Sequence, residues 1–256
     1  MKAYLIHCNL FSNRLKPATT ALEACGFDIE IVSTWDADQI DSKLISSGSE
    51  ERWDYAINFI AAILIANASI IALKDSTYAE VLQQSKELLN SNAKLPRWMD
   101  SRKLKPGEIS VLLKHYYAIS SIANSTNSHG LIAEDDIIRH DKSEYAMKDL
   151  EEELPNNNYD YIDLAGGAGL DAKANSVPMA GNLWHVNPAR TRTNACYIIS
   201  KKYAQSIVNK FFPLIFPIDL HLQYLFGLEQ PNLCCWANDP IFIHGSELNI
   251  YKSWRF

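Results

Sequence analysis

Short apolar runs and helical patterns alternate along this chain from its first residues. Residues 3–8 are typical of a strand, 17–25 of a helix, and 28–33 alternate apolar and polar side chains as a second strand does. Gly26 follows the predicted helix, where a residue in the left-handed conformation commonly ends one. This β-α-β opening favours a mainly parallel sheet with helices packed on it.

The next segment predicts a helical insertion at about 54–100, outside the sheet. Its first part, residues 56–73, contains no charged side chain over 18 positions, which approaches the length of a transmembrane helix. Three polar residues interrupt this run, and a span here would put the first strand and the later acidic motif on opposite sides of a membrane. We therefore favour a buried or membrane-apposed helix, followed by a second helix over 76–89.

The second half of the chain continues the alternation of helices and strands. Apolar positions at helical spacing predict a helix over 109–123. Further predicted elements are strands at 131–133, 159–164, 195–200 and 241–243, and helices over 201–210 and 220–226. The segment 165–193 is rich in Gly and Pro and has little periodicity, so we predict a long loop that forms one wall of a binding site.

Composition places the chain among ordinary soluble globular proteins. Of its 256 residues, 47% are apolar and 21% charged, which excludes disordered, collagen-like and fibrous classes. We expect a single α/β domain over 1–256 that contains the helical insertion. The formal net charge of -6 offers no overall basic field, so we expect no nucleic-acid partner.

The cysteines and the first residues bear on the compartment. The five cysteines are irregularly spaced and form no Cys-X-X-Cys pair, so neither a disulfide framework nor a zinc site is expected. The sequence runs directly into its first predicted strand, without the hydrophobic segment and cleavage site of a signal peptide. Both observations favour free thiols and a cytoplasmic location.

Three consecutive acids, Glu134, Asp135 and Asp136, end the predicted strand at 131–133. Because side chains alternate along a strand, Glu134 and Asp136 share one direction and Asp135 takes the other. Crowded carboxylates are unfavourable unless a cation or hydrogen-bond donors offset their repulsion, and oxygen ligands suit Mg²⁺ or Mn²⁺ with substrate phosphates. The acids alone leave two interpretations open, a metal-nucleotide site and a solvated acidic loop.

A wider set of motifs resembles one enzyme family. The segment 105–109, then His115, then 131–137 with its three acids, is similar in order and spacing to the signature of the family 25 glycosyltransferases, which include lipooligosaccharide and collagen galactosyltransferases. Weaker similarities are Leu10 with Arg14, 193–200 with Ala204, and 217–219. The chain departs from the family at Ser110 and Lys114, where members often carry Gly and Ser.

This resemblance implies a GT-A type fold, a sheet flanked by helices that binds a nucleotide-sugar with a divalent metal, Mn²⁺ or Mg²⁺. It implies that Asp136 binds the metal, that Glu134 contacts the metal or the donor sugar, and that Asp135 contacts metal, ribose or donor sugar. His244 follows the predicted strand at 241–243, a position from which several GT-A enzymes supply a metal-binding histidine. A structural role for this single histidine is the alternative.

Other residues are candidates for donor binding and catalysis. Asp219 is our leading base for an inverting transfer, with capping of the following helix as the alternative and Asp239 in reserve. Arg14, after the first strand, is a candidate for pairing with the diphosphate or for capping the first helix. Arg190 and Arg192 in the long loop either hold phosphates or an anionic acceptor, or lie on a solvated face.

Histidine and aromatic residues offer supporting roles. His115 would orient a carboxylate by donating a hydrogen bond, or else is a satisfied core histidine. Trp184, His185 and Tyr197 offer rings for packing against a sugar, or belong to the core. Residues 251–256 mix bases and aromatics, which suits contact with an anionic membrane surface or an ordinary C-terminal tail.

The resemblance therefore implies metal-assisted transfer of a hexose from a UDP-sugar, with galactose as the family-level choice, to a hydroxyl of a glycan or glycolipid acceptor such as a lipopolysaccharide precursor. Peripheral contact with the cytoplasmic face of the inner membrane is part of this expectation. One alternative is a catalytically inactive nucleotide-sugar- or glycan-binding protein of the same fold. Another is a metal-dependent phosphohydrolase, which would need a denser set of carboxylates and histidines.

Overall fold

A computed structural model describes most of the chain outside the predicted insertion. The described residues are 1–38, 104–141, 143–154, 157–167, 170, 176–179, 182–212, 214, 217–245, 248, 250 and 251. The predicted helices at 54–100 and most of the segment 251–256 lie outside these residues. No helix in the described part of the chain is long and apolar enough to cross a membrane.

The chain opens as the pattern predicts, with strand β1 (Lys2–Ile6), helix α1 (Ser12–Glu23) and strand β2 (Asp28–Val32). A single 3-10 turn, η1 (Asn9–Phe11), leads into α1. The predicted start of this helix at Pro17 is wrong, because α1 begins at Ser12 and carries Pro17 inside it. The buried residues of α1 begin with Arg14, before the proline. Packing therefore also covers the turn in which Pro17 has no N–H group to donate.

The remaining elements follow in chain order. They are α6 (Pro106–Asn124), β3 (His129–Glu134), β4 (Ile137–Arg139), α7 (Ser143–Glu153), β5 (Tyr161–Asp163), β6 (Ser176–Pro178), β7 (Leu183–Val186), β8 (Cys196–Ser200), α8 (Lys201–Val208), α9 (Ile218–Leu228), β9 (Cys234–Ala237) and β10 (Phe242–His244). The prediction of one long loop at 165–193 is wrong in part, because β6 and β7 form an antiparallel pair within it. These strands are three and four residues long, too short for periodicity to show.

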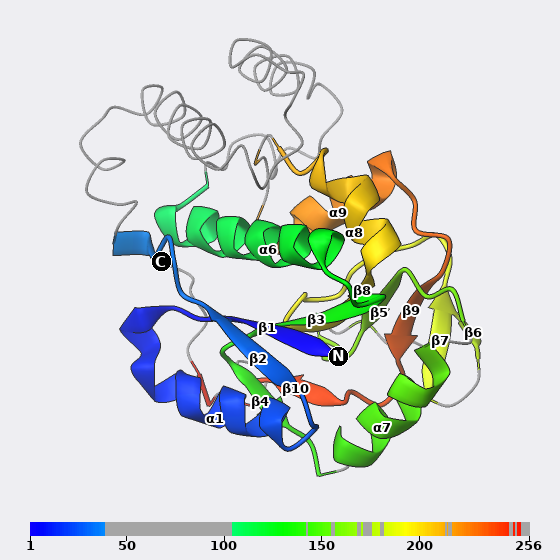
Figure 1. Ribbon diagram of the computed structural model, residues 1–256, viewed down its shortest axis with the longest axis horizontal. Coiled ribbons are helices and arrows are strands. Elements are labelled where there is room, and N and C mark those ends of the chain that lie inside the picture. The colour runs from blue at the N-terminus through cyan, green and yellow to red at the C-terminus, as the bar shows by residue number, and fades with distance from the viewer. Residues whose placement is uncertain are drawn as a thin grey trace.

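The strands form a mixed sheet in the order β2-β1-β3-β8-β5-β9-β7-β6 (Figure 1). The pairings make β7 and β8 run opposite to the other six strands. Strands β10 and β4 form a separate antiparallel pair. The predicted α/β class, with a large and mostly parallel sheet flanked by helices, is confirmed and is consistent with a Rossmann-like fold.

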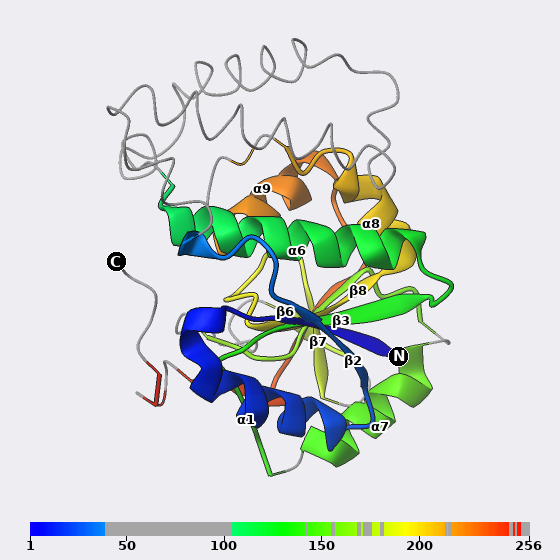
Figure 2. The same cartoon turned by 60° about the vertical axis from the view of Figure 1, so that its left-hand side comes forward.

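Helices cover both faces of the sheet, as Figures 1 and 2 show. One face packs against α6, α8 and α9, and the other against α1 and α7. Alternate residues of β1 supply both cores, since Tyr4 and Ile6 belong to the first and Ala3 and Leu5 to the second. The central strands β1, β3 and β8 are therefore buried on both sides, which explains why they are short apolar runs.

Helix α6 lies close to β3 because Gly130 has no side chain. A Cβ atom at this position would lie 2.4 Å from Cγ1 of Ile122, well inside van der Waals contact. This close approach packs the last turn of α6 against the start of β3, at the opposite end of that strand from Glu134.

The order of the strands creates a switch point at β1. The chain passes from β1 to β2 on one side, whereas β3 lies on the other side, parallel to β1 and with Ile6 opposite Glu134. Ligands of open α/β sheets bind outside the carboxyl ends of the strands at such a point. The predicted acidic motif lies at this place in the fold.

Candidate metal centre

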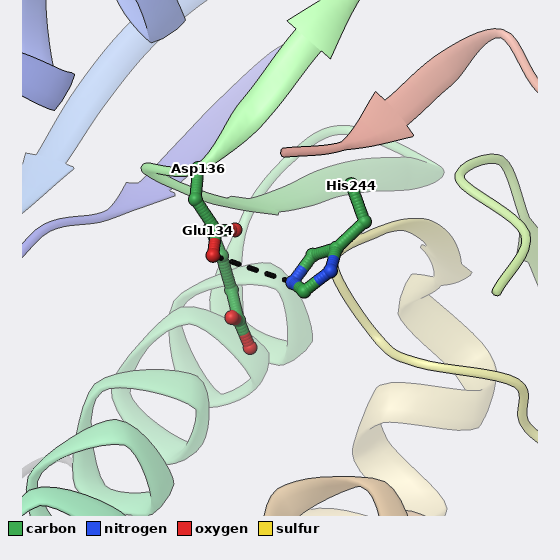
Figure 3. A group of neighbouring side chains, drawn as sticks. All are labelled: Glu134, Asp136 and His244. Atoms are coloured by element: carbon green, nitrogen blue, oxygen red, sulfur yellow. Dashed lines mark ion pairs between the residues drawn. The ribbon is translucent and has the colours of Figure 1, made fainter. Parts of the chain in front are cut away.

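Glu134, Asp136 and His244 meet at the carboxyl end of β3 (Figure 3). Each offers one ligand atom, and these atoms lie within 4.8 Å of one another. Glu134 is the last residue of β3, Asp136 lies in the turn that follows, and His244 ends β10. The β10–β4 pairing sets His244 opposite Ile137, and His244 Nε2 lies 3.3 Å from Asp136 Oδ2. The structure thus brings together the three residues that the sequence suggested as metal ligands.

Asp135 points to a different set of partners, as the alternation along the strand predicts. Its Oδ2 accepts a hydrogen bond from the backbone N–H of Cys8 at 3.1 Å and lies 2.7 Å from Nδ1 of His7. Its Oδ1 accepts a hydrogen bond from Arg14 at 3.4 Å. Asp135 therefore joins the loop after β1 to the loop after β3.

The cluster crowds carboxyl groups together at a partly buried position, where the side chain of Glu134 is 24% exposed. Burial raises the pKa of Glu134 well above its usual range, and the charges of Asp136, Asp219 and Asp135 raise it further, while His244 acts in the opposite direction. Burial is also the largest cause of the raised pKa of Asp135, despite its donors. A bound cation would favour the ionised form of these carboxyl groups.

The donor set fits a divalent metal ion. Asp136 Oδ1 is a buried acceptor without a hydrogen-bond partner in the described part of the protein, so it is available as a ligand. Two carboxylates and an imidazole form a mixed oxygen and nitrogen set, which suits Mn²⁺ better than Mg²⁺, since Mg²⁺ favours oxygen ligands. Glu134, Asp136 and His244 are the residues that would hold the ion.

A solvent-open cleft with about 390 Å³ of empty space adjoins these ligands. Its walls come from the ends of β1 and β3, from the start of α1 and from one face of α6. The lining residues are Ile6, His7, Cys8, Arg14, Gly107, Ser110, Val111, Lys114, Glu134, Asp135 and Asp136.

Two buried cations lie in the walls of this cleft. The Arg14 guanidinium lies 4.1 Å from the ring centroid of Phe11 and 4.9 Å from that of Tyr251, and it also lies 3.7 Å from Asp136. The ammonium group of Lys114 donates to the carbonyl of His7 at 2.6 Å and pairs with Asp36.

Sequence reasoning missed His7, Asp36 and Lys114 as members of this site. His7 and Asp36 follow strands β1 and β2, and polar residues at such positions reach the carboxyl edge of the sheet, so their positions could have identified them. Lys114 could have been identified because a lysine on the buried face of a helix is rarely found without a partner for its charge.

His115 lies directly under Glu134 and is completely buried. Its Nε2 lies 3.3 Å from Glu134 Oε1, and its Nδ1 lies 2.9 Å from the hydroxyl of Tyr197. Burial lowers the pKa of His115 to about 3, so the ring is neutral. Tyr197 is itself fully buried, so of the two roles that the sequence left open for it, the core role is observed and the sugar-facing role is not.

Asp219 lies near the cluster but outside its core. It is an exposed residue in the first turn of α9, and its charge raises the pKa values of both Glu134 and His115. Pro217 occupies the N-cap position, and no side chain caps the helix, so the alternative role of Asp219 as a cap is not seen. Asp239, the reserve candidate, is exposed in the turn after β9 and is joined to Asn182 through its backbone.

The two loop arginines lie elsewhere. Arg192 is buried and forms an ion pair with Asp163 at 2.7 Å, at the end of β5 and two strands away from Glu134. Arg190 is partly buried, and its guanidinium lies 5.6 Å from the ring centroid of Trp236. Neither contact is with the acidic cluster.

No protein-family model matches the chain, and no curated protein matches it either. The geometry of this site and the motif that forms it are therefore the basis for assigning a function.

Proposed function

We propose that this protein is a metal-assisted glycosyltransferase of GT-A type that transfers a hexose from a UDP-sugar to a glycan acceptor. The observation that supports it best is the convergence of Glu134, Asp136 and His244 within 4.8 Å beside an open cleft at the switch point of the sheet. A motif that resembles the family 25 signature forms two of these three ligands.

A divalent ion held by these three residues would neutralise charge that develops on the leaving nucleoside diphosphate. The residues around it have their own tasks. Lys114 adds a fixed positive charge to the cleft wall, and its bonds to His7 and Asp36 hold it in place. Arg14 is held by two aromatic rings and by Asp135, so its charge is oriented before a ligand arrives. Both cations are already paired with carboxylates, so an anionic donor in this cleft also needs the charge of the divalent ion.

Asp219 is the proposed general base. In an inverting transfer the acceptor hydroxyl oxygen bonds to the anomeric carbon, the bond from that carbon to the diphosphate breaks, and the hydroxyl proton passes to a carboxylate. Asp219 is exposed, so an acceptor from solvent can reach it, and its charge acts on Glu134 across the site. The resemblance alone supports three further parts of the proposal. These are galactose as the sugar, a lipopolysaccharide-type acceptor and contact with the cytoplasmic membrane face.

Calorimetric titration with UDP, UDP-galactose and UDP-glucose, each with Mn²⁺ and with EDTA, tests this proposal. We expect binding that depends on the metal and is lost in Asp136→Ala. Asp28→Ala is a matched control, because Asp28 is an exposed acid at the opposite end of the parallel strands. Absence of binding by all three nucleotides would contradict the proposed donor class.

Turnover separates the enzyme from the binding protein. We expect Asp219→Asn to bind the donor as the wild type does but to release no UDP in the presence of acceptor glycans. Near-normal turnover by Asp219→Asn would eliminate it as the base. Metal-dependent donor binding by a wild-type protein that turns over no acceptor would favour the inactive nucleotide-sugar-binding alternative.

A further inference from the structure

A chain of hydrogen bonds runs from the core of the sheet to the candidate metal centre. It begins at Tyr197 in β8, passes through His115 in α6 and ends at Glu134 in β3. Tyr197 and His115 have no exposed surface, and β8 pairs with β3 so that Tyr197 lies opposite Ile132. The chain therefore connects three elements that are distant in the sequence.

The hydroxyl of Tyr197 decides the direction of these bonds. Within the described part of the chain its one hydrogen-bond partner is Nδ1 of His115. A neutral imidazole has one donor nitrogen and one acceptor nitrogen. If Nδ1 carried the proton, the buried hydroxyl hydrogen of Tyr197 would have no acceptor among the described residues. The arrangement that satisfies every group has the hydroxyl donating to Nδ1 and Nε2–H donating to Glu134.

Packing holds the two rings in this relation. The rings of Tyr197 and His115 lie within 8° of parallel, with their centroids 5.8 Å apart. Tyr161 stacks against Tyr197 with a centroid distance of 5.3 Å, and Phe226 packs edge-on against Tyr161. The hydroxyl of Tyr197 is thus directed at His115 by the surrounding aromatic core.

We propose that Tyr197 is a positioning residue that fixes His115 as the Nε2–H tautomer, so that His115 holds the carboxylate of Glu134 in the cluster with Asp136 and His244. The inference rests on the proposed function for the identity of what Glu134 binds, a divalent metal. Partners that orient a metal ligand in this way commonly contribute about 10–100-fold to metal affinity. Tyr197 has this effect without touching the metal or the donor.

The tautomer is measured directly on the metal-free protein. A proton–nitrogen correlation spectrum of the histidine rings distinguishes Nε2–H from Nδ1–H, and the signal that disappears in His115→Gln identifies His115. We expect the Nε2–H pattern in the wild type and a mixture of tautomers in Tyr197→Phe. An Nδ1–H pattern in the wild type would overturn the inference.

Manganese affinity then measures the effect on the cluster. We expect Tyr197→Phe to weaken Mn²⁺ binding by about tenfold or more. Tyr161→Phe is the matched control, because it also removes a buried hydroxyl, one that donates to Asn194 instead of His115. Equal weakening in the two variants would show a packing effect alone and would refute the positioning role.

A conservative substitution provides the rescue. The side-chain amide of His115→Gln offers a donor nitrogen near the place of Nε2, whereas His115→Leu offers none. We expect the Gln variant to bind Mn²⁺ about tenfold more tightly than the Leu variant, and equal affinities would contradict the donor role. If the wild type binds no Mn²⁺, the proposed function fails, while the ring spectrum alone still decides the direction of the hydrogen bonds.

Discussion

Replacing Arg192 by Met should destabilise the fold strongly, because this residue forms a buried ion pair. The side chains of Arg192 and Asp163 are only 3% and 1% exposed, and the guanidinium donates to Asp163 Oδ1 at 2.7 Å and 3.1 Å. It also donates to the carbonyls of Asp163 and Ala237. Without the arginine, the carboxylate stays buried, and among the described residues the one remaining donor to it is the backbone N–H of Gly166. Breaking a buried pair by removing one partner costs about 3–5 kcal/mol.

Urea denaturation followed by circular dichroism measures this loss. Lys210→Met is the control, because Lys210 pairs with Glu229 on the surface, where an ion pair contributes at most about 1 kcal/mol. Adding Asp163→Leu to Arg192→Met removes both charges and should recover much of the stability.

A contrary result would restore the role that the sequence suggested for Arg192. If Arg192→Met loses no more stability than Lys210→Met but binds UDP-sugars poorly, the residue contacts the donor and the reasoning from burial is wrong.

Two further predictions concern stability. Burial lowers the pKa of His221 from 6.5 to about 4, so below about pH 6.5 the unfolded chain takes up a proton that the folded protein does not. The stability that the neutral ring contributes is therefore complete above about pH 6.5 and is lost as the pH falls toward 4. Between about pH 7 and pH 5 the wild type should lose about 2 kcal/mol more than His221→Gln, measured by urea midpoints, and equal losses would disprove the burial effect. Gly130→Ala should lower the free energy of unfolding by about 1–3 kcal/mol, because the added Cβ meets Ile122. In thermal unfolding, the double variant Gly130→Ala with Ile122→Ala should lose less stability than the two single variants lose together.

The sequence predicted those parts of the structure that local patterns determine. The β-α-β opening, α6 and β3 follow from periodicity, and the shared direction of Glu134 and Asp136 follows from their spacing on one strand. His244 was found only through the resemblance, because its approach to Asp136 depends on the β10–β4 pairing.

Contacts between distant segments were beyond local reasoning. Lys114 reaches the carbonyl of His7 across 107 positions of sequence, and His7 reaches Asp135 across 128. No periodicity marks such partners. For Arg192 the sequence left open a contact with phosphates or an anionic acceptor and a place on a solvated face, whereas the structure buries its guanidinium against Asp163. A charged residue in a loop has no local pattern that separates a ligand contact from an internal ion pair.

Titration of the protein with Mn²⁺ in the presence of UDP, followed by the electron paramagnetic resonance of free Mn²⁺, tests the central claim most directly. The wild type should bind one ion with saturation, and Asp136→Asn and His244→Ala should each bind at least about tenfold more weakly, while Asp28→Asn binds as the wild type does. Unchanged affinity in both Asp136→Asn and His244→Ala, or no saturable binding by the wild type, would contradict a metal centre at the end of β3.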